Sequence, residues 1–187
     1  LPVNERANLG IFLGMQMPVE IEGVSNADFL RTALRSKKGN NFKLFEFIKT
    51  LDTQIENLKM NKDMIHRSIN LGFSGGERKK NEILQMQILK PRIVMLDEID
   101  SGLDVDSLKL IGKSVAEYYK KEKPALLLVT HYQRLLDYIV PDFVHVLYEG
   151  KIAFSGDKTL VKEIEESGYE KLLKKYANKL EGNKEDE

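Results

Sequence analysis

The run Ile93-Val94-Met95-Leu96-Asp97-Glu98 is the most informative stretch of the chain, because it has the pattern of a fully buried strand that ends in two acids. In α/β proteins, side chains at the carboxyl ends of parallel strands line the crevice where ligands bind. There Asp97 can hold Mg²⁺, which prefers hard oxygen ligands and keeps much of its water. Glu98 can polarise a water molecule aimed at a phosphate. The alternative is a strand that simply ends in solvated acids.

Strands and helices alternate on both sides of this run. Apolar strands separated by helices indicate a mostly parallel sheet flanked by helices, so the predicted fold class is α/β. The predicted strands are 9–16, 93–97, 125–130, 143–148 and 152–154, and the predicted helices are 77–89, 105–119, 134–139 and 159–180.

Residues 17 to about 70 follow a different pattern. Pro18 prevents simple continuation of the first strand, residues 17–25 are predicted to be a loop, and no strong strand follows. The stretch 42–58 carries apolar residues at helical spacing, which indicates a helical insertion. The predicted domains are therefore core residues 1–16, a helical subdomain at 17–73, core residues 74–158, and C-terminal helices with an acidic tail at 159–187.

The composition excludes several classes of site. The 29 basic and 29 acidic residues cancel, so no overall charge draws the chain to nucleic acid or anionic lipid. There is no cysteine, so disulfides, thiolate metal sites and cysteine nucleophiles are excluded within the chain. The longest apolar runs are far shorter than the roughly 20 residues that span a bilayer. We therefore expect neither nucleic-acid binding nor direct membrane insertion.

The loop Ser74-Gly75-Gly76-Glu77 is a second candidate site. Ser74 can cap the following helix, and the two glycines let backbone N–H groups approach an anion closely. Basic residues at 78–80 oppose the helix dipole, which favours an anion nearby. The alternative, preferred for this loop taken alone, is a helix start whose basic residues are solvated.

Three further features lie close to the predicted strand ends. Gln16 ends the first strand, Ser101-Gly102-Leu103-Asp104 follows the acid pair, and Thr130-His131 closes the next strand. Gln16 is a neutral candidate ligand for Mg²⁺ or water, and the imidazole of His131 can donate to a phosphate oxygen. Taken singly, a histidine at the end of a strand is more often structural than functional, and Gln16 is the least specific of these features.

In combination and in this order, the five features resemble those of the ATP-binding cassette (ABC) ATPases. The resemblance implies a Q-loop at Gln16, a signature motif at 74–77, a Walker B strand at 93–97, a D-loop at 101–104 and a switch histidine at 131. It implies ATP and Mg²⁺ as cofactors, with ATP held between two copies of the chain. The implied site residues are Glu98 and His131 for catalysis, Gln16, Ser74, Gly75, Gly76, Glu77 and Asp104 for ATP, and Asp97 and Gln16 for Mg²⁺.

Longer stretches resemble one branch of these ATPases. Residues 16–26, 70–86, 97–104, 130–134 and 136–147 are similar to the SufC family, the ATPase subunits of the Suf iron–sulfur cluster assembly system. Glu77 supports the similarity to the SufC family, in which Glu is expected there, because transporter ATPases usually have Gln at that position. The resemblance implies SufB/SufD-like scaffold partners, on which the cluster ligands lie, consistent with the absence of cysteine here. It also implies a cytoplasmic protein, or one in a plastid-type organelle in a eukaryote.

One motif of the family does not occur in these 187 residues. ABC ATPases cradle the phosphates in a G-x-x-x-x-G-K-S/T loop, which in the family lies upstream of the position matching Leu1. We therefore expect this chain to be part of a longer protein. Two other readings stay open: the nucleotide-binding subunit of an ABC transporter, with a membrane-embedded partner, and a catalytically silent interaction fragment.

Partner docking is expected on residues 15–30, because in ABC ATPases the groove beside the Q-loop receives helices of the partner. The segment Met15–Val24 is unusually apolar for a loop that follows a strand. The alternative is that these apolar side chains pack against the helices of the subdomain.

Overall fold

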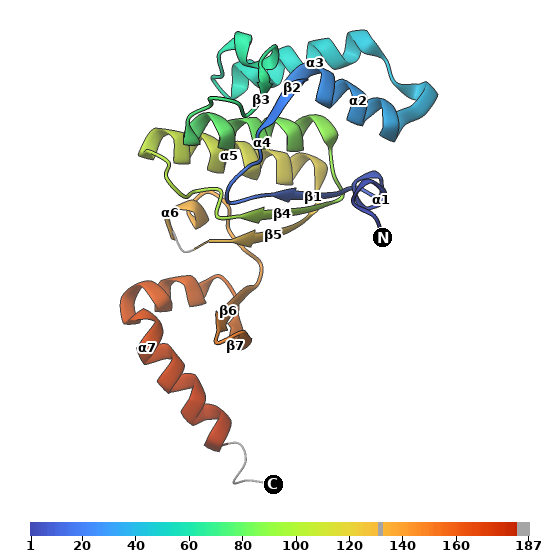
Figure 1. Ribbon diagram of the computed structural model, residues 1–187. Coiled ribbons are helices and arrows are strands. Elements are labelled where there is room, and N and C mark those ends of the chain that lie inside the picture. Colours follow the sequence, from blue (N-terminus) through green and yellow to red (C-terminus); the bar gives the residue numbers. More distant parts are fainter. Residues whose placement is uncertain (131–132, 183–187) are drawn as a thin grey trace. The chain divides into compact units, whose positions relative to one another are not determined.

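The computed structural model describes residues 1–130 and 133–182 (Figure 1). The chain divides into two compact units, Leu1–Tyr138 and Ile139–Glu187. The domain boundaries expected from the sequence, at 16/17, 73/74 and 158/159, stay a prediction.

A three-stranded parallel sheet forms the centre of the first unit. β4 (Ile93–Asp97) lies between β1 (Ile11–Gly14) and β5 (Ala125–Val129), and both neighbours run parallel to it. The parallel sheet confirms the predicted α/β fold class. Because all three strands run in the same direction, their carboxyl ends meet at one edge of the sheet, where Gly14 pairs with Leu96 and Asp97 pairs with Val129.

Two long helices, α4 (Gly75–Leu89) and α5 (Val105–Glu122), lie over one face of this sheet (Figure 1). In β4, Val94 and Leu96 are fully buried, whereas Ile93 is exposed, as expected for a strand with one covered face. The core also contains fully buried side chains of both helices, namely Ile83, Leu84, Met86, Ile111 and Val115.

The segment between β1 and α4 is mostly helical, as predicted. It contains α2 (Asn26–Lys38) and α3 (Leu44–Asn57), with short 3₁₀ turns at Gly39–Asn41 and Lys62–Ile65. Each helix buries one apolar stripe, formed by Leu30 and Leu34 in α2 and by Phe47, Leu51 and Ile55 in α3.

The prediction of a loop at 17–25 is wrong for its second half. Residues Ile21–Ser25 form β2, which pairs antiparallel with the two-residue strand β3 (Ser68–Ile69) across an irregular register. Nearly all of β2 is exposed, so its sequence lacks the alternation that marks a half-buried strand. Its partner strand lies more than 40 residues away in the chain, so no pattern within a short stretch of sequence could predict the pairing.

The short helices of the first unit were the least predictable elements. No helix was predicted where α1 (Val3–Asn8) forms. The helix expected at 134–139 is shorter, and α6 covers only Gln133–Leu136, while α5 extends three residues beyond its predicted end. Helix ends are the least determined part of a sequence-based assignment.

The second unit consists of a hairpin and a C-terminal helical segment. β6 (Val144–Tyr148) and β7 (Lys151–Gly156) pair antiparallel through the two-residue loop Glu149-Gly150, in which both residues have positive φ. The helix α7 (Thr159–Gly182) is interrupted at Gly168, whose φ is 73°. The small core is formed by Val146, Phe154, Leu160 and Leu172, and the Phe154 ring stacks on Tyr176 at 4.2 Å between centroids.

In the part of the chain that the structure describes, no helix combines the length and the apolar character needed to cross a membrane.

Candidate functional site

The carboxyl edge of the parallel sheet brings together Gln16, Asp97 and Glu98. Gln16 follows β1 by two residues, Asp97 is the last residue of β4, and Glu98 comes directly after it. The Gln16 side-chain amide donates from Nε2 to Oε2 of Glu98 over 2.6 Å. Two residues predicted for one site therefore touch, although 82 positions separate them in the chain.

The backbone turns sharply at Glu98. Its φ is 45°, a left-handed conformation that is uncommon for a residue with a side chain. The turn is fixed on both sides, because the Glu98 N–H donates to the carbonyl of Val129 over 2.9 Å and the Ser101 N–H donates to the Glu98 carbonyl over 3.1 Å. Unusual backbone conformations that the surrounding structure holds in place are frequent at functional sites.

A buried acid that the sequence reasoning missed lies just after this turn. Asp100 is only 4% exposed and accepts a hydrogen bond at Oδ2 from the Thr130 hydroxyl over 2.5 Å. In the described part of the chain its Oδ1 has no hydrogen-bond partner. The bond ties the start of the D-loop to the end of β5, next to His131, which lies outside the described residues. The sequence did contain a signal for Asp100, because it is the third acidic residue in the four positions 97–100.

The backbone of Met15 and Gln16 is held from α4. Lys79 donates from Nζ to the carbonyls of Met15 and Gln16 over 2.7 and 2.8 Å, and Glu82 accepts from the Met15 N–H over 2.8 Å. Burial raises the pKa of the Glu82 carboxyl to about 7, against the opposing effects of the Met15 N–H and Lys79. Burial also lowers the pKa of Lys79, although nearby acids, Glu82 first, oppose this. The sequence reasoning treated Lys79 only as a basic residue near an anion.

Two side chains of the signature loop, those of Ser74 and Glu77, form a reciprocal cap at the start of α4. Ser74 caps α4 by accepting from the Glu77 N–H over 3.3 Å, and Glu77 accepts in return from the Ser74 N–H over 2.8 Å. The backbone hydrogen bond from Ser74 is the main reason that the pKa of Glu77 lies below its usual value. In the described residues, the hydrogen bonds of these two side chains stay within the loop.

The D-loop lies beside the signature helix. Asp104 caps α5 by accepting from the Ser107 N–H over 2.7 Å, and this hydrogen bond lowers the pKa of the carboxyl. A Cβ placed on Gly76 would lie 3.8 Å from Leu103 Cδ2 and 4.0 Å from Ser107 Oγ. The structure thus brings Gly76 and the segment 103–107 together, which spacing in the sequence did not show.

The strand edge offers few ligands for a metal. Among the described residues, no three side chains of His, Cys, Asp or Glu are grouped so that they could hold an ion. Mg²⁺ at phosphate sites is bound by one or two protein oxygens, with phosphate and water oxygens completing the shell. One carboxylate oxygen, from Asp97, and one amide oxygen, from Gln16, match that requirement in number and kind.

The tripeptide Gly112-Lys113-Ser114 matches the end of a phosphate-binding loop, but the structure excludes that role. It lies in the middle of α5, where backbone N–H groups are bonded to carbonyls one turn back and cannot cradle an anion. Gly112 also packs against Tyr138, whose Cδ2 would lie 2.9 Å from an added Cβ.

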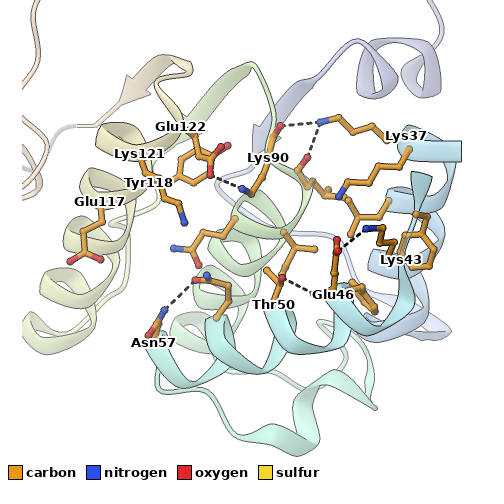
Figure 2. Close-up of a pocket in the computed structure, with 18 residues that line it drawn as sticks. Lys37, Lys43, Glu46, Thr50, Asn57, Lys90, Glu117, Tyr118, Lys121 and Glu122 are labelled. Carbon is orange, nitrogen blue, oxygen red and sulfur yellow. Dashed lines mark hydrogen bonds and ion pairs between the residues drawn. The ribbon is translucent and has the colours of Figure 1, made fainter. Parts of the chain in front are cut away.

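A hollow of about 590 Å³ lies between α2, α3, α4 and α5, away from the predicted site residues, none of which lines it (Figure 2). Several of its charged groups are already paired: Lys43 lies 3.2 Å from Glu46, and Lys90 lies 2.6 Å from Glu122. Lys37 donates from Nζ to the carbonyls of Leu89, the last residue of α4, and of Lys90, its C-cap. The candidate site is therefore the strand edge with its neighbouring loops.

Comparison with solved structures defines the class of fold. A dimeric bacterial ABC transporter cassette matches with a TM-score of 0.71 over 84% of this chain and 68% of that one, at 16% identity. A dimeric cassette in a post-hydrolysis state, bound to ADP and inorganic phosphate, matches with a TM-score of 0.71 over the same shares, at 15% identity. The fold is that of an ABC cassette. No family model matches the chain.

Sequence relatives are more specific. The chain is 52% identical over 173 residues to the probable ATP-dependent transporter SufC of Escherichia coli K12, covering 90% of this chain and 69% of that protein. It is 50% identical over 176 residues to a probable ATP-dependent transporter of Synechocystis sp. PCC 6803 (92% and 68% covered) and 48% identical over 172 residues to vegetative protein 296 of Bacillus subtilis (91% and 66%). The chain belongs to the SufC family of ABC ATPases. It spans about two thirds of the length of these relatives.

Proposed function

We propose that the complete protein is the ATPase subunit of an iron–sulfur cluster assembly scaffold. ATP binding, dimerisation and hydrolysis would drive a conformational change in SufB/SufD-like partners, in the cytoplasm or in a plastid-type organelle of a eukaryote. The contact between Gln16 and Glu98 at the carboxyl edge of the sheet carries the ATPase part of the proposal. The identity to the SufC of Escherichia coli supports the assembly part.

In this proposal the residues at the strand edge act on the γ-phosphate and the attacking water. Asp97 and Gln16 hold Mg²⁺, which would neutralise charge on the phosphate oxygens. Glu98 polarises the attacking water, while the hydrogen bond from Gln16 fixes one of its carboxylate oxygens. His131 is proposed to donate a hydrogen bond to a phosphate oxygen.

The signature loop is proposed to contact the phosphates held by a second copy. The first N–H groups of α4, at Gly75 and Gly76, have no acceptors within the helix and lie at the positive end of its dipole. The capping pair of Ser74 and Glu77 gives the loop a fixed shape. Asp104 would contribute to the same nucleotide site from the adjacent D-loop. The solved cassettes of the same fold are described as dimeric, which supports a nucleotide site shared by two copies.

Docking of the partner is proposed on residues 15–30. Met17 is 81% exposed and Val19 is 61% exposed, so most of each side chain is free of the helices of its own subdomain. Met15, Ile21 and Val24 are partly covered, with 43%, 41% and 38% of their surface exposed. Exposed apolar side chains that are contiguous along a segment are typical of protein–protein contacts. Methionine adds an adaptable surface for an apolar helix face.

The test is co-purification of the complete protein with a SufB–SufD-like scaffold. Met17→Glu together with Val19→Glu should abolish co-purification, because two charges would be buried without partners. Phe45→Glu is the matched control, since this side chain is equally exposed but lies on α3, outside residues 15–30. Unchanged binding by the Met17/Val19 variant would move the docking site elsewhere, and a complete protein without ATP turnover would refute the ATPase assignment.

A second function has one observation in its favour. The relatives from Escherichia coli and Synechocystis are both described as probable ATP-dependent transporters. As the nucleotide-binding subunit of a transporter, the chain would share the site chemistry but bind a membrane-embedded partner. Fractionation of the native complex distinguishes the two functions, because a transporter subunit would pellet with membranes and the subunit of an assembly scaffold would not.

A further inference from the structure

Helix α4 contacts the loop after β1 through two charged side chains one turn apart. The Glu82 carboxylate accepts from the Met15 N–H through Oε1, and Lys79 donates to the carbonyls of Met15 and Gln16. The two side chains lie 3.8 Å apart, from Lys79 Nζ to Glu82 Oε2. β1 ends at Gly14, so Met15 and Gln16 lie beyond the hydrogen bonds of the sheet and are held by α4 instead.

The burial of this pair calls for a structural reason. Lys79 is 4% exposed and Glu82 is 5% exposed. Lys and Glu are almost never fully buried unless they are paired, and a buried ion pair contributes little to stability because desolvating its charges is costly. Here the pair makes three hydrogen bonds to the backbone of Met15 and Gln16. That target is the segment that presents the Gln16 side chain to Glu98.

The rest of the loop is held from the same side. Arg78 pairs with Glu20 at 2.5 Å, and Asn70, which accepts from Asn81 of α4, donates to the Val19 carbonyl over 2.9 Å. The two ends of the loop are thus fixed to α4, whose N-terminus carries the signature motif.

We propose that Glu82 is a positioning residue for the ATPase reaction: by holding the Met15 N–H, it sets where Gln16 lies against Glu98. The inference rests on the proposed ATPase function. It adds that the helix behind the signature motif controls the geometry at the strand edge. Glu82 touches neither nucleotide nor water in this role and acts through the backbone of Met15.

The test uses the complete protein with two substitutions at one position. Glu82→Gln keeps an oxygen that accepts from the Met15 N–H, whereas Glu82→Leu has a similar size and no acceptor. We expect Glu82→Leu to lower kcat by roughly tenfold or more with the KM for ATP nearly unchanged, because small misplacements in a site cost one to two orders of magnitude. Glu82→Gln should retain most of the turnover.

Two readouts separate positioning from a general loss of stability. Amide hydrogen exchange at Met15 should accelerate in Glu82→Leu and stay near the wild-type rate in Glu82→Gln. In a double-mutant cycle, adding Glu82→Leu to Gln16→Ala should lower kcat no further, since the group to be positioned is gone. Ile83→Ala, at the neighbouring buried position, serves as control: it should lower the melting temperature without changing the Met15 exchange rate.

If Glu82→Leu does not fold, Lys79→Met combined with Glu82→Leu replaces it, because this pair leaves no buried charge unpaired. Folded variants with an unchanged Met15 exchange rate, or with additive losses in the cycle, would overturn the proposal. Should the complete protein hydrolyse no ATP, the proposed function fails, and Met15 exchange still decides whether Glu82 holds the loop.

Discussion

The signature loop and the strand edge are two parts of one candidate site, but they are built by different kinds of contact. Ser74 and Glu77 cap α4 with hydrogen bonds between residues three apart. At the strand edge, Gln16 meets Glu98 across 82 positions, and Glu82 reaches Met15 across 67. A local cap forms wherever the helix forms, whereas the strand edge exists only when the sheet and α4 are assembled. The two parts should therefore respond differently to mutation.

The largest effect is expected at the strand edge. Glu98→Gln in the complete protein should slow ATP hydrolysis by roughly 10²–10³-fold, because a neutral amide cannot polarise the attacking water. ATP binding should persist, and an ATP-bound dimer should accumulate. Phosphate release measures turnover, and Glu46→Gln, on the exposed side of α3, is the control. Near wild-type turnover in Glu98→Gln would remove this residue from the catalytic role.

The next effect concerns the long-range contacts around α4. Asn81 is fully buried and donates to the side-chain oxygens of Asn26 and Asn70 over 2.8 and 2.9 Å. Asn81→Ala leaves both oxygens buried without this donor, so the free energy of unfolding should fall by about 3 kcal/mol. Urea denaturation measures it. Asn57→Ala makes the same change at an exposed helical position and should alter stability by only about 0.5 kcal/mol.

A pH series tests the buried pair of Lys79 and Glu82. The pKa of Glu82 is about 7 in the fold and 4.5 in the unfolded chain, so between these values the folded state binds more protons. Wild-type stability from this group therefore falls as pH rises from 5 to 7.5. Glu82→Gln lacks the effect, and its stability relative to wild type should improve by about 1–3 kcal/mol over that range. A pH-independent difference in urea denaturation would contradict the raised pKa.

The smallest effect is expected in the local cap. Ser74→Ala should lower the free energy of unfolding by about 1 kcal/mol, the usual loss for an N-cap. Amide exchange at Met15 should not change, because the cap does not support the strand edge. Ser36→Ala, at an exposed position of α2, should have almost no effect on stability. Faster exchange at Met15 in Ser74→Ala would show that the two parts of the site are coupled.

Several features of the fold could be predicted because they depend on neighbouring residues. The apolar run of β4, the alternation that led to a parallel sheet, and the Ser74 cap all follow from local pattern and side-chain chemistry. The strand β2 could not be predicted, since its side chains are exposed and its partner is distant. The roles of the predicted site residues stay predictions, and His131 lies outside the described residues.

The sequence by itself determined the fold class, the family and the order of the motifs, because each depends on the type and spacing of residues along the chain. Only the tertiary structure decided that Gln16 contacts Glu98, that Asp100 is buried against Thr130, and that Lys79 and Glu82 hold the loop after β1. It also decided that Gly112-Lys113-Ser114 is the interior of a helix. These facts depend on which distant backbone groups lie within hydrogen-bond reach once the helices have packed on the sheet, and that information is not present in any short stretch of the chain.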